Sequence, residues 1–180
     1  MSPVHTYVAL LRAVNLGARH RLPMARLREL AEIAGATRAR TYLQSGNVVL
    51  DAEQSDPDAV AEVLRAVLAD DGLATEVVVR PAEAIVELAS AGHPHDAGQT
   101  TPQNLQVAFP VLPVSREAVA GVPIAGDEQV SWWRGEIALH YPSGMGRSKL
   151  TTAHLAKHLG TPVTCRNWRT VRAVSELAAT

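Results

Sequence analysis

Short apolar runs alternate with amphipathic stretches along the first half of the chain. The stretch that opens at Asp56-Pro57 carries Val60, Val63, Leu64, Val67 and Leu68, which is the spacing of a helix with one buried face. A second stripe opens at Pro23 and stops before Gly35, a residue that favours helix ends. The expected helices are therefore 23–34 and 57–71, and the expected strands are 4–11, 40–43, 48–50 and 75–80.

The same order of elements recurs in the second half. The expected strands lie at 105–109, 129–133, 136–141 and 163–165, and the expected helices at 115–119, 150–159 and 168–179. Each half reads β-α-β-β-α-β, the arrangement of ferredoxin-like folds, and the second adds a C-terminal helix. The sequence therefore predicts an α+β protein with ferredoxin-like halves at 1–80 and 104–180, joined by a linking helix and loop at 81–103. We expect the halves to form one compact unit.

Size and composition fit a globular protein that folds without disulfide bonds. The chain has 180 residues and one cysteine, Cys165, so no disulfide can form within it. Its start lacks the basic and apolar regions of a signal peptide, and no apolar run approaches the ~20 residues that span a bilayer. These observations predict a cytoplasmic protein without a membrane partner.

Charge is distributed unevenly although the net charge is only −1. Residues 1–50 carry seven arginines against two glutamates, and residues 131–180 carry seven basic side chains against two acidic ones. Residues 51–130 carry three arginines against fourteen acids. If the two basic ends meet in space, their fields add and attract an anionic ligand.

A glycine-rich turn at 141–151 separates an expected strand from an expected helix. Gly144 and Gly146 permit backbone conformations that other residues disfavour, and Ser148 is a good helix N-cap. Together with Arg147 and Lys149, the free N–H groups at the start of the helix would form a positively charged concavity that suits a phosphate or carboxylate. The glycine spacing fits neither a P-loop nor a dinucleotide fingerprint.

Three further polar segments stand where strands end. The first loop follows the first strand, 45–47 joins two strands, and 164–170 spans the junction between the last strand and the last helix, with two arginines, an amide and an indole. In the last segment we also expect Asn167 to cap the helix and Trp168 to be buried. With the glycine-rich turn, the candidate ligand-binding residues are Arg12, Asn15, Gly17, Arg21, Ser45, Asn47, Gly144, Gly146, Arg147, Ser148, Lys149, Arg166, Asn167 and Trp168.

Segments 11–17, 22–24, 41–47, 144–150 and 164–168 together resemble the family called domain of unknown function 1697. The resemblance covers nearly the whole chain. It implies a compact α+β fold built by duplication and no established activity. Two residues of the first loop depart from the family pattern: Ala18 stands where a second glycine is usual, and His20 where Asn is frequent.

Other chemistries find less support. The pair His154 and His158 and the segment 93–96 lack the further ligands of a metal site, so we predict no metal and no cofactor. Seven aromatic residues and a pI near 6.7 argue against recognition of RNA bases on a sheet.

Three functional hypotheses remain. The first is a basic cleft that binds a small anionic ligand, bordered by Arg12, Asn15, Lys149, Arg166 and Asn167. Lys149 and Arg166 would stabilise developing negative charge if the protein is an enzyme, a question left open because no general base is identifiable. The second is a non-catalytic binder of nucleic-acid backbones, and the third an interaction protein whose motifs serve folding.

Overall fold

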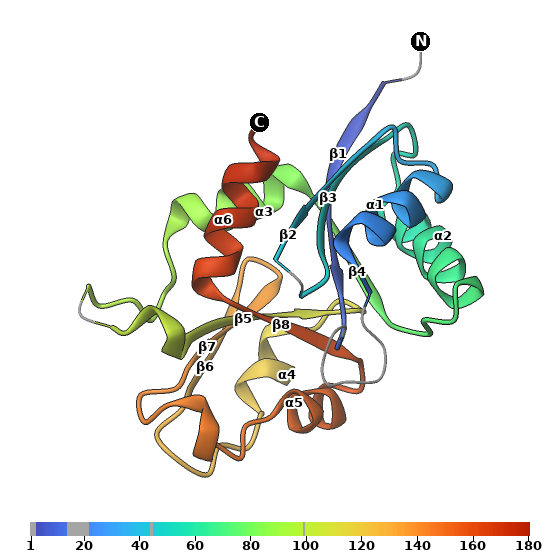
Figure 1. Ribbon diagram of the computed structural model, residues 1–180. Coiled ribbons are helices and arrows are strands. Elements are labelled where there is room, and N and C mark those ends of the chain that lie inside the picture. The colour runs from blue at the N-terminus through green and yellow to red at the C-terminus, as the bar shows by residue number, and fades with distance from the viewer. Residues whose placement is uncertain (1–2, 14–21, 44, 99) are drawn as a thin grey trace. The chain divides into compact units, whose positions relative to one another are not determined.

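The computed structural model describes residues 3–13, 22–43, 45–98 and 100–180 (Figure 1). The chain divides into two compact units. Unit 1 comprises Met1–Glu87 and Ala173–Thr180, and unit 2 comprises Leu88–Arg172. None of the helices in the described ranges has the length and apolar character needed to cross a membrane.

Unit 1 contains an antiparallel sheet of four strands and two helices that lie between strands in the sequence. Helix α2 begins where predicted, since the Asp56 carboxylate accepts a hydrogen bond from the Asp58 N–H and Pro57 takes the first helical position. Helix α1 is followed by Gly35, whose φ of +100° suits glycine. The elements in order are β1 (His5–Leu11), α1 (Met24–Ile33), β2 (Arg38–Tyr42), β3 (Asn47–Ala52), α2 (Pro57–Asp70) and β4 (Val77–Pro81).

The sheet of unit 1 has the strand order β2-β3-β1-β4, with every neighbouring pair antiparallel. In strand β1, Tyr7, Ala9 and Leu11 belong to one hydrophobic core. The apolar faces of α1 and α2 add residues such as Leu27 and Leu64, and strands β3 and β4 add further buried side chains. Alternation in the strand and helical spacing in the two helices therefore meet in this core.

Unit 2 repeats this organisation. Its sheet has the order β6-β7-β5-β8, again antiparallel throughout. One core packs Ile137 and Leu139 of the sheet against Val119 and Leu155 of its helices. The elements are β5 (Leu105–Pro110), α4 (Arg116–Ala120), β6 (Gln129–Trp133), β7 (Glu136–His140), α5 (Thr152–Leu159) and β8 (Val163–Asn167).

Further helices accompany the two series. They are α3 (Ala82–Ala91), α6 (Trp168–Ala178) and the 3-10 turns η1 (Pro102–Asn104) and η2 (Met145–Arg147). The α+β class is thus confirmed, with two four-stranded antiparallel sheets in the described parts of the chain. Helix α5 is shorter than predicted, because Thr151 is its N-cap and accepts a hydrogen bond from the His154 N–H.

Candidate functional site

The glycine-rich turn has glycine-type backbone geometry at Gly144 but departs from the expected geometry at Gly146 and Ser148. Gly144 has a φ of +84°, whereas Gly146 does not adopt a positive φ. Residues 145–147 form the 3-10 turn η2, and Ser148 follows it in an extended conformation. The prediction that Ser148 caps the next helix is therefore wrong, and Lys149 precedes the helix instead of lying in its first turn.

The hydroxyl groups of the turn are held by nearby carboxylates. Ser143 Oγ donates to Asp127 Oδ2 at 2.6 Å, and Ser148 Oγ donates to Glu128 Oε1. The Leu150 N–H in turn donates to Ser148 Oγ at 3.0 Å. The hydrogen bond from Ser148 is the largest cause that lowers the pKa of Glu128. An anion could use the Ser148 hydroxyl only by displacing a carboxylate, so this side chain explains the shape of the turn better than it explains binding.

Arg147 and Lys149 are the basic side chains of the turn. Both are exposed, and neither forms an ion pair within the described ranges. A cation without an acidic partner is available to an external anion, although an exposed position also makes it well solvated. These two side chains are what the turn offers to a ligand.

Arg166 lies in strand β8 and is buried, with 8% of its surface exposed. Its Nη1 donates to Thr164 Oγ1 at 2.8 Å and to the Cys165 carbonyl oxygen at 2.9 Å. Burial lowers the pKa of this guanidinium to about 10. Arg166 and the exposed Lys149 thus differ in access to solvent, which the sequence did not indicate.

Asn167 and Trp168 have the structural roles expected of them. Asn167 Oδ1 accepts a hydrogen bond from the Arg169 N–H at 2.9 Å and so satisfies a free N–H at the start of α6. Trp168 is 4% exposed, and its ring meets those of His93 and Trp133 at centroid distances of 5.4 and 5.8 Å. The prediction of a buried Trp168 is confirmed.

The junction at 45–47 is likewise held by its own side chains. Asn47 is 1% exposed, and its Nδ2 donates to the Tyr42 carbonyl oxygen at 2.9 Å and to Ser45 Oγ at 2.8 Å. Gly46 has a φ of +71°, and its carbonyl oxygen accepts from the Leu11 N–H at 2.8 Å. These contacts order the turn between β2 and β3.

The first loop is described only at its start and end. Asn15, Gly17 and Arg21 lie outside the described residues. Arg12 follows strand β1 directly. Its N–H donates to the Glu76 carbonyl oxygen at 2.9 Å, and its own carbonyl oxygen accepts from Thr75 Oγ1 at 2.6 Å. The backbone on either side of the arginine is thereby fixed.

Arg12 lines a cavity of about 450 Å³ in unit 1, which we call the arginine cavity. Arg65 of helix α2 lines it as well and was not among the predicted site residues. One feature of the sequence could have drawn attention to Arg65: it is the only basic residue from 51 to 79, in an otherwise acidic stretch. The lining residues are Arg12, Ala13, Arg65, Ala69, Leu73, Ala74, Thr75 and Glu76.

The arginine cavity carries a positive balance. Arg65 Nη1 lies 3.4 Å from Glu76 Oε2. Both side chains are more than a third exposed to solvent, so this ion pair is weak. Arg12 has no side-chain partner within the described residues. Two guanidinium groups against one carboxylate leave one positive charge in excess.

Metal and thiol chemistry gain no support. No group of three or more His, Cys, Asp or Glu side chains that could hold a metal ion occurs in the described part of the chain. Desolvation is the main reason that the pKa of the Cys165 thiol is raised to about 11, so the thiol stays protonated near neutrality.

The fold and these residues define an α+β protein with two four-stranded antiparallel sheets and exposed basic side chains in segments that follow strands. The family described as Protein of unknown function (DUF1697) matches residues 4–137, and the chain belongs to this family.

A solved structure supports the fold over the full length. The conserved bacterial protein SP0830 from Streptococcus pneumoniae is similar with a TM-score of 0.71 at 18% identity. The match covers 98% of this chain and 99% of that chain. None of the curated proteins compared with the chain matches it significantly.

Proposed function

We propose that the protein binds a small anionic ligand, with a phosphate or carboxylate group, in the arginine cavity. The observation that carries the proposal is the presence of Arg12 and Arg65 in the lining of one cavity with a single carboxylate, Glu76. Guanidinium groups recognise phosphate and carboxylate through paired N–H donors. Thr75 Oγ1 already donates its hydrogen to the Arg12 carbonyl oxygen, so this hydroxyl cannot donate to a ligand. The two guanidinium groups are the remaining side-chain donors of the lining.

Binding without catalysis is the activity we propose. Glu76, the carboxylate in this lining, lies 3.4 Å from Arg65 Nη1, and we assign it to the positioning of that guanidinium. The glycine-rich turn of unit 2 is a separate candidate for anion binding through Arg147 and Lys149, which are exposed and without ion pairs in the described ranges.

The decisive experiment is calorimetric titration with inorganic phosphate and with citrate at low ionic strength. We expect Arg12→Gln to weaken binding by about ten-fold or more, because a charge-assisted hydrogen bond contributes ~1.5–3 kcal/mol. Arg38→Gln is the matched control, since Arg38 is exposed on β2, outside this cavity, and the substitution removes the same charge. Equal affinities of Arg12→Gln and the parent protein would refute the assignment.

Lys149→Ala tests the turn separately. Lys149 is exposed and precedes helix α5, so its loss leaves the melting temperature unchanged. We expect weaker anion binding in this variant and unchanged binding in Lys157→Ala, an exposed control on α5.

Titration with mixed oligonucleotides over a salt series examines the nucleic-acid alternative. Steep salt dependence without sequence preference would favour that alternative.

We also propose that the chain arose by duplication of a ferredoxin-like unit, with halves at 1–80 and 104–180. Both sheets have the same strand order and the same antiparallel pairing, and the helices occupy equivalent places in the sequence. Superposition of β1–β4 with α1 and α2 on β5–β8 with α4 and α5 tests this. Failure of the six elements to align together would contradict it.

A further inference from the structure

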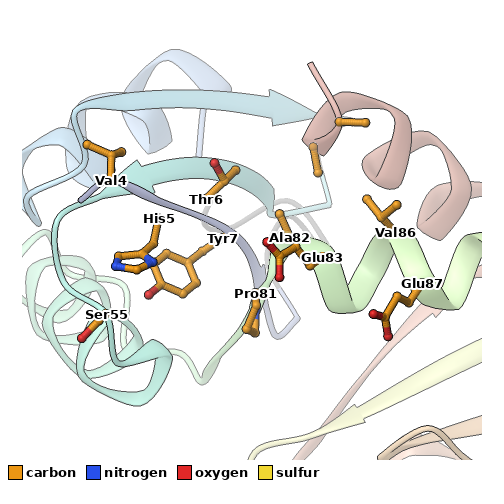
Figure 2. Close-up of a pocket in the computed structure, with 12 residues that line it drawn as sticks. Val4, His5, Thr6, Tyr7, Ser55, Pro81, Ala82, Glu83, Val86 and Glu87 are labelled. Atoms are coloured by element: carbon orange, nitrogen blue, oxygen red, sulfur yellow. The ribbon is translucent and has the colours of Figure 1, made fainter.

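A larger cavity, of about 600 Å³, lies at the start of strand β1, the end of that strand opposite to Arg12. Figure 2 shows its lining, which includes Thr6 and Tyr7 of β1 and Glu83 of helix α3. Val86 and Ala178 contribute apolar surface. We call it the glutamate cavity. All of its lining residues belong to unit 1, and its volume suits a small organic molecule.

The hydroxyl groups in this lining are committed as donors to the protein itself. Thr6 Oγ1 donates to Asp51 Oδ1 at 2.8 Å, and Tyr7 Oη donates to the Gln54 carbonyl oxygen at 2.7 Å. A hydroxyl has one hydrogen and two lone pairs, so each oxygen can still accept a hydrogen bond but has none left to donate. Tyr7 is buried in the core on one face of the sheet and Thr6 lies on the other face, so a ligand that contacts the Thr6 oxygen must bring a donor.

Glu83 adds a carboxylate to the same lining. It lies in the first turn of α3, is exposed, and has no hydrogen-bond or ion-pair partner within the described ranges. In Figure 2 its carboxylate is turned toward β1. Glu87 lies one helical turn later and also lines the cavity, whereas no lysine or arginine is among the described residues that do so. Ionised carboxylates only accept hydrogen bonds, so charge and hydrogen-bonding character agree.

The surroundings of Tyr7 support the same conclusion. Burial is the main cause that raises the pKa of Tyr7, and the Asp56 carboxylate raises it further. The phenol therefore keeps its proton, and its hydrogen bond to Gln54, at any pH near neutrality. The influence of Asp56 adds negative potential at this end of β1.

We propose that the glutamate cavity binds a small organic cation, a primary ammonium group on an aliphatic body. The ammonium N–H groups donate to the Glu83 carboxylate and to the acceptor oxygen of Thr6. The methylene groups pack against the apolar surface of Val86 and Ala178. This site is separate from the arginine cavity and takes a ligand of opposite charge, so it does not depend on the proposed anion binding.

The test compares ligands of the same shape and different charge. Titrations monitored by backbone amide NMR use n-pentylammonium, neutral 1-pentanol and anionic pentanoate. We expect n-pentylammonium to shift the amide signals of the lining residues in a saturable way, with shifts of Thr6 and Ala178 among the largest. We expect 1-pentanol to bind at least ~5-fold more weakly, because it lacks the charge that strengthens these hydrogen bonds.

Variants locate the site. Glu83→Gln keeps the shape of the side chain and removes its charge, so we expect the Kd for n-pentylammonium to rise at least ~5-fold. Glu62→Gln is the control, because Glu62 is exposed on α2 outside this cavity. Ala178→Leu fills part of the volume and should block binding without removing charge. The proposal is overturned if the three ligands bind alike, if n-pentylammonium does not bind, or if Glu83→Gln binds it as the parent does.

Discussion

Several polar residues that the sequence suggested as ligand contacts instead form hydrogen bonds within the protein. The Asn167 side chain caps helix α6 and also donates from Nδ2 to two carbonyl oxygens of η1. Asn47 closes the turn between β2 and β3. Ser148 is bonded to Glu128. Each side chain satisfies polar groups that would otherwise lack partners, which is a requirement of folding whatever the protein binds.

Gly144 is the residue of the glycine-rich turn whose replacement should destabilise the fold. Its φ of +84° is unfavourable for a residue with a Cβ atom, so we expect Gly144→Ala to lower the free energy of unfolding by ~1–2 kcal/mol. Gly146→Ala is the matched control. Gly146 has no positive φ, and a Cβ there would meet no atom within 4 Å. Urea denaturation of both variants checks this, and equal losses would show that φ at Gly144 is not the cause.

Trp168→Ala should remove a large part of the stability of unit 2. The indole is buried and packs against two other rings, so truncation should cost ~3–5 kcal/mol. Trp168→Phe keeps an aromatic ring in the same place and should lose less. Thermal melts compare the variants. A variant Trp168→Ala as stable as the parent would indicate an indole available to a ligand.

At the level of elements, local signals placed most helices and strands well. Asp56 with Pro57, and Ser115, cap helices near the residues expected from the sequence. Strand β8 extends to Asn167, past the short run that was predicted, because residues 163–167 pair with β5. Pairing with a partner strand continued a strand whose own sequence was weakly apolar.

The start of helix α5 depends on a side-chain cap whose contribution can be measured. Thr151 Oγ1 accepts a hydrogen bond from the His154 N–H at 3.1 Å, so Thr151→Ala should destabilise unit 2 by ~1 kcal/mol. Thr151→Ser retains an accepting oxygen and should restore most of that loss. Chemical denaturation followed by circular dichroism measures both. The assignment of the cap is wrong if Thr151→Ala unfolds at the same denaturant concentration as the parent.

At the scale of the whole molecule, a group of imidazoles makes stability depend on pH. His93 is buried and bonds to the Gln106 carbonyl oxygen through Nε2, and its Nδ1 faces the His95 N–H at 3.3 Å. The His95 ring stacks on that of His140. Burial is the main cause that lowers the pKa of both His93 and His95. At His93 the hydrogen bond to the Gln106 carbonyl oxygen, and to a smaller extent the Asp96 carboxylate, partly oppose it.

Acid should therefore destabilise the protein in the range where unfolded histidine gains a proton. The folded-state pKa of these two imidazoles lies below the ordinary 6.5, so the unfolded chain binds more protons between the two values. Their contribution is complete above the unfolded pKa and is lost as pH falls below about 6.5, the ordinary histidine value. Denaturation midpoints across this range measure it, above the pH at which the carboxylates titrate.

A variant assigns this pH dependence to the imidazole group. His95→Gln should flatten the profile below about pH 6.5, because one group that binds a proton on unfolding is gone. His158→Gln is the control, since His158 is exposed on helix α5. A profile of His95→Gln that follows the parent would rule out this origin.

The sequence by itself determined the α+β class, the order of the elements and the burial of Trp168. These follow from spacing of apolar residues and from residues such as Pro57 and Gly35, whose preferences act over a few positions. The sequence also predicted Arg12 as a ligand-binding residue, and that assignment stays a prediction. What a residue and its near neighbours dictate can be obtained from the pattern alone.

Tertiary structure decided the roles that depend on partners distant in the chain. Ser148 donates a hydrogen bond to Glu128, twenty residues away, and Thr151 caps helix α5 in its place. Arg65 shares a cavity with Arg12 across more than fifty residues. Arg166 is buried although its side chain is charged. In these cases the free energy of folding depends on which groups the fold brings within hydrogen-bonding distance. The periodicity of apolar residues carries no information about those pairings.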